Sequence, residues 1–283
     1  MIASRDRAYE LATTVARLLD STACPIIVVD NDSHDDSVAI MKRIAARSAG
    51  RLRVIELDTN RGAVGRNVGL AATCTPYVAF CDDDSWWTPE SPARGADLFD
   101  RHPSLGLLAA RTIVWPQRRE DRFSAQLADS ALGRRRDLPG PSILGFMSCA
   151  AMVRKRAFEA AGGFSEILHF RGEEQLLAID MAALGWDLCY CQDLIAIHQP
   201  STLRASTAAQ DARTLRNAVL TTWLRRPMTQ CLKATAVLLW AALHDREHAR
   251  GAAEAICRLP DVISERKPLP SHVEHALAVL ESH

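Results

Sequence analysis

Three consecutive aspartates, Asp82, Asp83 and Asp84, directly follow the apolar run 77–81. Neighbouring carboxylates repel one another unless a cation neutralises their charge. If the backbone stays extended there, the first and third side chains project to one side and the second to the other. Two carboxylates on one side suit Mg²⁺ or Mn²⁺, which take oxygen ligands and bind diphosphates. A solvated acidic turn or helix cap is the alternative, but the tryptophan pair at 86–87 is unlike such a turn.

Other polar residues stand where a nucleotide could bind. Asp30 ends the apolar run 25–29 and could accept a hydrogen bond from a base or ribose. Aspartate is equally common as a plain residue between a strand and a turn. Residues 60–62 (Asn-Arg-Gly) and 65–67 (Gly-Arg-Asn) form a turn into a helix with a cation at its start. Such a helix N-terminus can hold an anion.

Two glutamates and a histidine complete the candidates. Glu173 and Glu174 follow Gly172 in the first turn of a predicted helix. Carboxylates favour the positive end of a helix, which would explain both residues without chemistry. The functional alternative is a general base that takes a proton from an acceptor. His198 ends an apolar strand, where it is either a structural cap or a third metal ligand.

The elements that would position these residues alternate between strands and helices. A continuous apolar run, as in a strand buried on both faces of a parallel sheet, occupies residues 25–29, and residues 52–57 and 77–81 are also predicted strands. Helical periodicity marks residues 11–19, 40–44 and 64–72. This order predicts βαβ units and a Rossmann-like, mostly parallel sheet. Because ligands bind beyond the carboxyl ends of such strands, Asp30 and the three aspartates should meet there.

The second half of the chain is less regular. Periodicity is lost over residues 115–141, which predicts a long loop that could act as a lid. Strand character returns at 143–153, 186–191 and 194–198, and helices are expected at 155–161 and 172–185. Beyond Pro200 the chain looks helical, with breaks near Pro227, Pro260 and residues 268–270.

Composition excludes some classes of protein. The formal net charge is zero, so no general affinity for nucleic acid is expected. Eight cysteines without a C-x-x-C pair, and no secretory signal, predict reduced thiols in a cytoplasmic protein. The longest apolar stretch, 234–243, is too short to span a bilayer. The amphipathic segment around it should pack on the catalytic domain or in a homodimer, with peripheral contact at the inner membrane face as the alternative.

The order and spacing of these motifs resemble family-2 glycosyltransferases over roughly residues 1–225. The motifs of the nucleotide half are Val28-Val29-Asp30-Asn31, Asn60-x-Gly62, Gly65-Arg66-Asn67-x-Gly69 and Phe80-x-Asp82-x-Asp84. Those of the acceptor half are Gly162-Gly163-Phe164, Gly172-Glu173-Glu174, Gly185-Trp186 and His198-x-Pro200-Ser201.

The resemblance implies an α/β fold of the GT-A type, with a central, mostly parallel sheet flanked by helices. Residues 1–205 would form the catalytic domain, with a nucleotide-sugar half at about 1–115 and an acceptor half at about 140–205. Residues 206–283 would form a C-terminal helical extension. The implied donor is a nucleotide-diphosphate sugar, a UDP-sugar above all, and the implied cofactor is Mn²⁺ or Mg²⁺. The acceptor would be a saccharide, a lipid-linked compound or a small molecule.

The resemblance also implies a role for each site residue. Glu174 stands where the family usually has an aspartate as catalytic base, and Glu173 is its nearest rival. The metal ligands would be Asp82, Asp84 and His198, and the acceptor contacts Trp86, Trp87 and Gly172. The nucleotide-sugar site would contain Ser4, Arg5, Asp30, Asn60, Gly62, Arg66, Asn67, Asp82, Asp83 and Asp84.

The expected reaction is a single, metal-assisted sugar transfer with inversion of the anomeric configuration. No Gln-x-x-Arg-Trp motif of processive synthases is present, and only Met1-Ile2-Ala3 stand in place of a full first strand. A nucleotidyltransferase of related fold would need a Gly-rich basic loop after its first strand. A phosphatase with an aspartyl nucleophile would need Thr or Val where the tryptophans stand. An inactive GT-A-like binding protein is the third alternative.

Overall fold

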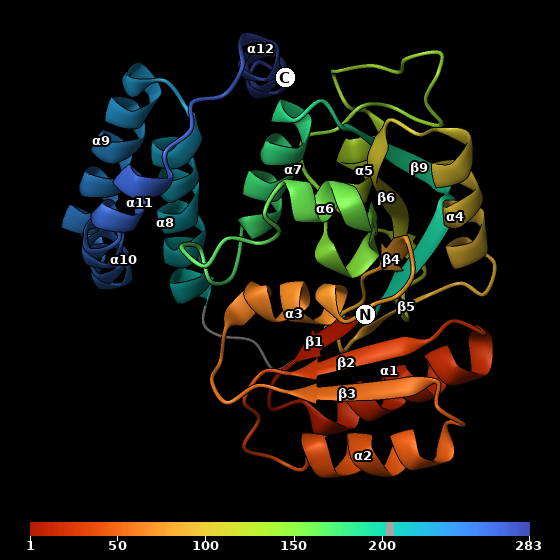
Figure 1. The fold of residues 1–283 in the computed structure, drawn as a ribbon. Coiled ribbons are helices and arrows are strands. Elements are labelled where there is room, and N and C mark those ends of the chain that lie inside the picture. The colour runs from red at the N-terminus through yellow and green to blue at the C-terminus, as the bar shows by residue number, and fades with distance from the viewer. Residues whose placement is uncertain (202–206) are drawn as a thin grey trace.

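The computed structural model describes residues 1–201 and 207–283 of the chain. A parallel sheet lies at one end of the molecule, a second sheet continues it, and a bundle of C-terminal helices stands beside the second sheet (Figure 1). The boundary predicted between residues 205 and 206 lies outside the described residues.

The first sheet consists of three parallel strands in the order β1-β2-β3. Every residue of β2 is buried, which explains its continuous apolar sequence. β1 has only three residues, as the short apolar start of the chain predicts. The elements are β1 (Ile2–Ser4), α1 (Ala8–Ser21), β2 (Ile26–Asp30), α2 (Ser37–Arg47), β3 (Leu52–Glu56), the 3-10 helix η1 (Gly62–Val64) and α3 (Gly65–Ala71).

The second sheet is mixed, in the order β4-β8-β6-β9-β5, and only β6 and β9 run parallel. Its strands are β4 (Tyr77–Ala79), β5 (Ser85–Trp87), β6 (Leu105–Val114), β7 (Arg119–Glu120), which pairs with β6, β8 (Ala151–Arg154) and β9 (Asp187–His198). The two strands predicted at 186–198 are one strand, β9, whose register against β6 shifts opposite Ala110 and Arg111.

The backbone joins the two sheets at the start of the chain. Ile2 forms a parallel bridge with Cys81. The N-terminal ammonium donates to the carbonyl oxygen of Ala79 at 2.8 Å. The amide of Cys81 donates to the carbonyl oxygen of Met1 at 2.9 Å. The central sheet is therefore parallel in its first half and mixed in its second, and the aspartates follow the strand at the junction.

Helices cover the second sheet. One of them lies in the segment for which the sequence predicts a long loop, so that prediction is wrong there. Within residues 115–141 the chain forms β7 and α5 (Arg122–Ala128). The Asp121 side chain caps α5 by accepting hydrogen bonds from the amides of Phe123 and Ser124. A seven-residue helix is too short to show clear periodicity, which is why the sequence pattern missed it. The other covering elements are α4 (Ser91–Arg101), η2 (Ser148–Ala150), α6 (Lys155–Ala160) and α7 (Glu173–Ala183).

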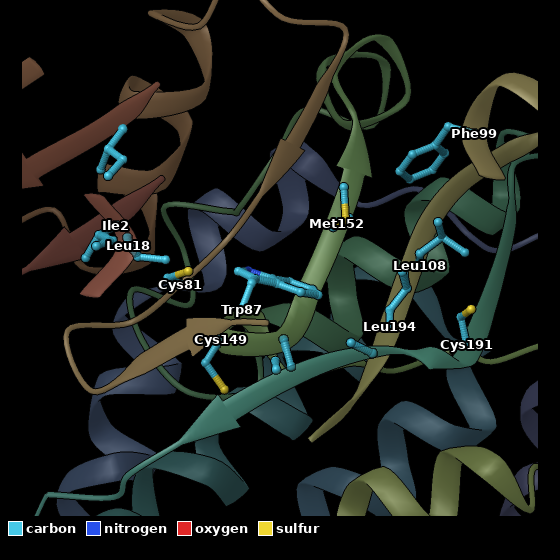
Figure 2. Close-up of a cluster of buried hydrophobic side chains, with 14 of the residues drawn as sticks. Ile2, Leu18, Cys81, Trp87, Phe99, Leu108, Cys149, Met152, Cys191 and Leu194 are labelled. Atoms are coloured by element: carbon cyan, nitrogen blue, oxygen red, sulfur yellow. The ribbon is translucent and has the colours of Figure 1, made fainter. Parts of the chain in front are cut away.

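The core that spans both sheets is shown in Figure 2. It combines Ile2 of β1 and Leu18 of α1 with Leu108 of β6 and Leu194 of β9. Trp87 lies in the middle of these side chains and is 2% exposed. All eight cysteines are free thiols, as the sequence predicts.

The C-terminal helices form their own core against α7. They are α8 (Thr207–Arg225), α9 (Met228–His244), α10 (Arg246–Cys257), α11 (Leu259–Glu265) and α12 (Ser271–Glu281). α9 leaves Leu232, Trp240 and Leu243 exposed to 68%, 65% and 83%. No helix among the described residues has the length and apolar content to cross a bilayer.

Arg226, directly after α8, binds two glutamates of α12. Arg226 is a buried residue, 8% exposed. Its guanidinium donates to both carboxylate oxygens of Glu274 at 2.9 Å and to Glu281 Oε1 at 2.5 Å. Arg226→Ala should lower the free energy of unfolding by about 1–3 kcal/mol, because charge-assisted hydrogen bonds are lost. Denaturant unfolding measures this, and hydrogen exchange should increase over α12.

The matched control is Arg250→Ala, because the Arg250 side chain is 73% exposed and, among the described residues, pairs only with Glu247 one turn away. An exposed pair of this kind contributes about 0.3–0.5 kcal/mol. Equal effects of the two substitutions would contradict the role given to Arg226.

Candidate active site

A cavity of about 540 Å³ opens beyond the carboxyl ends of β1 and β2. Most of the nucleotide-sugar and metal residues predicted from the sequence line it: Ser4, Arg5, Asn60, Gly62, Arg66, Asp82, Asp83, Asp84 and His198. They come from four separate stretches of the chain. The fold thus brings them together where ligands of α/β sheets bind.

The three aspartates form a turn between β4 and β5, rather than the extended segment assumed from the sequence. The Ser85 hydroxyl accepts from the amide of Asp82 at 2.8 Å, and the Ser85 amide donates to the carbonyl oxygen of Asp82. The Asp82 carboxylate lies against Arg66, whereas those of Asp83 and Asp84 both lie within 3.4 Å of Arg7 Nη2. The remaining partners of Asp83 and Asp84 differ.

Asp83 is held by structural partners. Its carboxylate accepts from the Ser4 hydroxyl at 2.8 Å and lies 3.1 Å from the Arg7 guanidinium, and its carbonyl oxygen accepts from Thr14. Burial raises the pKa of Asp83 to about 6, although Arg7 and Ser4 favour the ionised form. These contacts tie the aspartate turn to β1 and α1.

Asp84 and His198 meet because β5 pairs with β9, which places Ser85 opposite His198. The distance from Asp84 Oδ1 to His198 Nε2 is 3.4 Å, and both residues line the cavity. The amide of Ser201 donates to Asp84 Oδ2 at 3.2 Å. Burial favours the neutral form of Asp84, but the hydrogen bond and charge of His198 outweigh it and hold the pKa of Asp84 below its ordinary value.

This pair fits a divalent metal, since carboxylate oxygens are ligands that suit Mg²⁺ and Mn²⁺ and imidazole nitrogen also binds divalent metals. Within residues 1–201 and 207–283, no three His, Cys, Asp or Glu side chains form a ready-made metal cluster. Further ligands would therefore have to come from a bound molecule such as a diphosphate.

Asp82 pairs with Arg66 instead. Arg66 Nη2 lies 2.5 Å from Asp82 Oδ1, and Arg66 is 5% exposed. Burial alone would favour loss of its proton, but the charges of Asp82 and Glu173 outweigh it and raise the pKa of Arg66. Arg66 is therefore a fixed positive charge at the floor of the cavity, in the first turn of α3.

Asp30 is 3% exposed at the end of β2. One carboxylate oxygen, Oδ2, accepts from the amide of Ser33 at 2.9 Å. The other, Oδ1, has no hydrogen-bond partner among the described residues. Such a buried acceptor is costly unless a ligand supplies a donor.

The neighbouring Asn31 lines the cavity and was not among the predicted site residues. Its amide group donates to the carbonyl oxygen of Gly62 and accepts from the amide of Arg61. The Asn60 side chain accepts from the amide of Gly62. Gly62 itself has φ +58°, and a Cβ there would lie 2.2 Å from the carbonyl oxygen of His169. The motif around Asp30 was the signal that could have identified Asn31.

Five predicted residues line neither cavity: Asp30, Asn67, Trp86, Trp87 and Glu173. The Asn67 amide exchanges two hydrogen bonds of 2.9 Å with the backbone of Phe164, so it fixes the fold. Trp87 is a core residue whose indole donates to the carbonyl oxygen of Phe80, which corrects the expected contact with an acceptor. Trp86 packs under the Arg17 guanidinium, 4.1 Å from the ring centroid. Strand β5 faces the core and α1, which the sequence did not reveal.

The C-terminal helices contribute to the cavity, which the sequence did not suggest. Ala209, Gln210 and Arg213 of α8 line it opposite the sheet. Arg171 donates to the Gln210 side chain at 2.5 Å. His169 and Arg171 both adopt positive φ angles of 62° and 76°. Strained backbone of this kind is held by its surroundings and often lies at functional sites.

The two glutamates at the start of α7 have different environments. Glu174 accepts from the Ser148 hydroxyl at 3.0 Å and, with Gly172, lines a second cavity of about 1230 Å³. Glu173 is 2% exposed, and its Oε2 has no partner among the described residues. Burial, reinforced by the charge of Glu174, raises the pKa of Glu173 to about 8 despite the opposing charge of Arg66. Glu174 is thus the accessible carboxylate and Glu173 the buried one.

The raised pKa of Glu173 predicts a dependence of stability on pH. The folded protein keeps this proton up to about pH 8, whereas the unfolded chain loses it near pH 4.5. Between these values the folded state holds more protons, so its stability falls as pH rises. Relative to wild type, Glu173→Gln should gain stability by up to roughly 1.4 kcal/mol per pH unit in this window. Urea unfolding of both proteins at pH 5 and pH 8 checks this, and an equal difference at the two pH values would contradict it.

Comparison with known proteins agrees with the fold. The family described as "Glycosyl transferase family 2" matches residues 1–162, and "Glycosyl transferase family 21" matches residues 138–271. The first match covers more than half of the chain. The chain therefore belongs to glycosyl transferase family 2.

Among curated proteins, the pre-mycofactocin glycosyltransferase of Mycobacterium tuberculosis is 31% identical over 192 residues, which are 65% of this chain and 37% of that protein. The chain spans only 26% to 37% of the length of the curated relatives it matches.

Among solved structures, the mannosyltransferase PcManGT of Pyrobaculum calidifontis, in complex with GDP-Man and Mn²⁺, covers 99% of this chain and 78% of its own (TM-score 0.61, 15% identity). S. aureus TarS 1–349 with UDP-GlcNAc covers 97% of this chain and 82% of its own (TM-score 0.57, 15% identity). These structures establish the GT-A fold.

Proposed function

We propose that the protein is an inverting glycosyltransferase that moves one sugar from a nucleotide-diphosphate sugar, most simply a UDP-sugar, to an acceptor hydroxyl with the help of a divalent metal. The observation that carries this proposal is the first cavity. It collects the Asp84–His198 pair, the Arg66–Asp82 ion pair and the polar ends of β1 and β2. Similar structures that hold UDP-GlcNAc, or GDP-Man with Mn²⁺, support it.

In this proposal the nucleotide lies along the ends of the first sheet. Asp30 Oδ1 accepts a hydrogen bond from the base or ribose, because it is a buried acceptor that the described protein leaves unpaired. Asn31 and Asn60 shape the adjoining loop through their bonds to Gly62. Ser4 and Arg5 line the same wall.

Asp84 and His198 would hold Mn²⁺ or Mg²⁺, with Asp82 beside them. When bound, the ion neutralises charge that develops on the diphosphate as it leaves. Arg66 adds a fixed positive charge at the same place, because its burial leaves it little freedom to reorganise.

The chemical step assigns one role to Glu174. The acceptor oxygen forms a bond to the anomeric carbon while the bond from that carbon to the diphosphate oxygen breaks. The acceptor proton passes to Glu174, whose carboxylate is oriented by Ser148. A single displacement from the face opposite the leaving group inverts the anomeric configuration.

The products separate this proposal from its alternatives. The protein is incubated with Mn²⁺, UDP- or GDP-sugars and a panel of hydroxylated acceptors, and the products are identified by mass spectrometry. Release of a nucleoside diphosphate with a glycosylated acceptor is expected. Pyrophosphate would instead identify a nucleotidyltransferase, and nucleotide binding without turnover an inactive binding protein.

A homodimer, peripheral membrane contact and a cytoplasmic location stay predictions. The face of α9 with Leu232, Trp240 and Leu243 is the apolar surface on which either contact would rest.

A further inference from the structure

The second cavity has walls from four separate parts of the chain. One wall is α5, a second is the stretch 143–146, and a third includes Leu280 of α12. The fourth consists of Gly172 together with Glu174 and Gln175 in the first turn of α7. The cavity therefore ends at the carboxylate assigned as base, and it is separate from the cavity assigned to the nucleotide.

The lining is apolar over much of its extent. Phe123 and Leu127 of α5, Leu144, Phe146 and Leu280 all contribute. Phe123 is 38% exposed, whereas Leu144 and Phe146 are 8% and 3% exposed. An exposed aromatic ring above buried aliphatic and aromatic side chains is typical of a ligand site, not of a solvated surface.

The walls are fixed by polar anchors. The hydroxyl of Ser124, 0% exposed, accepts from the amide of Thr112 at 3.0 Å and so holds α5 on β6. The Asp121 cap fixes the amide of Phe123 at 2.8 Å. Arg226 holds α12 through Glu274 and Glu281. The cavity is thus preformed, which reduces the ordering that a ligand must impose.

We infer that this cavity binds the hydrophobic aglycone of the acceptor, an alkyl or aryl group attached next to the reacting hydroxyl, with Phe123 and Leu280 as its contact residues. The inference rests on the proposed function, because it takes the cavity beside Glu174 as the acceptor site. The polar residues Arg122, Asp129 and Gln175 at the same cavity face the hydroxylated part of the molecule. A long polysaccharide without an apolar group would leave the exposed ring of Phe123 uncovered.

Binding of matched glycosides by titration calorimetry tests this, with octyl, phenyl and methyl β-glucoside below micellar concentration. The octyl and phenyl compounds should bind at least tenfold more tightly than the methyl compound, since only they bury apolar surface. The octyl and phenyl arms separate a lipid-like from an aromatic aglycone. Equal affinity for all three compounds would overturn the inference.

Phe123→Ala should lower the affinity for whichever of the octyl and phenyl glucosides binds more tightly by about tenfold or more. Leu280→Ala should also lower this affinity. Leu232→Ala on α9, 68% exposed and away from the cavity, is the matched control and should change nothing. Unchanged affinity in both cavity variants would also overturn the inference.

Titration of the same samples with UDP or GDP and Mn²⁺ keeps the two proposals distinguishable. All variants should retain wild-type nucleotide affinity, which also shows that they fold. If nucleotide binds and the glycosides do not, the aglycone site is wrong and the proposed function stands. If no nucleotide binds to the wild type, the proposed function itself falls and the inference falls with it.

Discussion

Asp84→Ala should lower Mn²⁺-dependent affinity for the preferred nucleoside diphosphate by about 100-fold or more. Asp84 is the carboxylate next to His198, so its loss removes half of the proposed protein ligand set. We expect a loss of affinity of this size because a bound metal ion provides much of the electrostatic attraction for the diphosphate. Calorimetric titration with and without Mn²⁺ measures the effect. The overall fold should persist, because Arg7 keeps its 3.1 Å contact with Asp83.

Asp83→Asn is the matched control, one residue away. Its carboxylate is bound by Ser4 and Arg7 in the structure, so the substitution should lower the melting temperature and leave the dependence on Mn²⁺ in place. Affinity of the Asp84 variant that equals wild type, with and without metal, would contradict the metal site.

Glu174→Gln should reduce transfer to the acceptor by about 10²- to 10⁴-fold, the usual contribution of a general base. Glutamine keeps the size and the contact with Ser148 but cannot take up the acceptor proton. Nucleotide and metal binding should persist, because neither uses this side chain. Initial rates of product formation, together with calorimetric titration, separate the two effects.

Glu173→Gln is the internal control. Burial keeps Glu173 largely protonated at neutral pH, so a neutral amide of the same shape should change transfer little. A large loss in the Glu173 variant with a small loss in the Glu174 variant would make Glu173 the base. Small losses of transfer activity in both variants would mean that these carboxylates only stabilise the positive N-terminal end of α7.

Much of the fold follows from the sequence because local patterns decide it. The apolar run ending at Asp30 reads as a buried strand, and β2 is buried at every position. Glycines 172 and 185 mark the limits of α7, and both have positive φ. The mixed second sheet is a different matter. Whether β9 lies beside β6 or β4 depends on partners far apart in the chain, which no local pattern encodes.

The site shows the same division. The spacing of the aspartates located the turn, but it did not show that Asp82 would pair with Arg66. The resemblance predicts acceptor contacts for the tryptophans beside the motif, yet Trp87 fills the core between the sheets. Arg213 could not be found from sequence, because it reaches the cavity only through the packing of α8 against the catalytic core.

The most direct test of the proposed metal-dependent nucleotide site is a thermal-shift titration of the wild-type protein with UDP, GDP and other nucleoside diphosphates, with and without Mn²⁺. A ligand that binds only the folded state raises its stability by about 2.7 kcal/mol at 100 times its dissociation constant. We expect one nucleoside diphosphate to raise the melting temperature when Mn²⁺ is present and to do so far less without it. No shift with any nucleoside diphosphate, whether Mn²⁺ is present or absent, would contradict it.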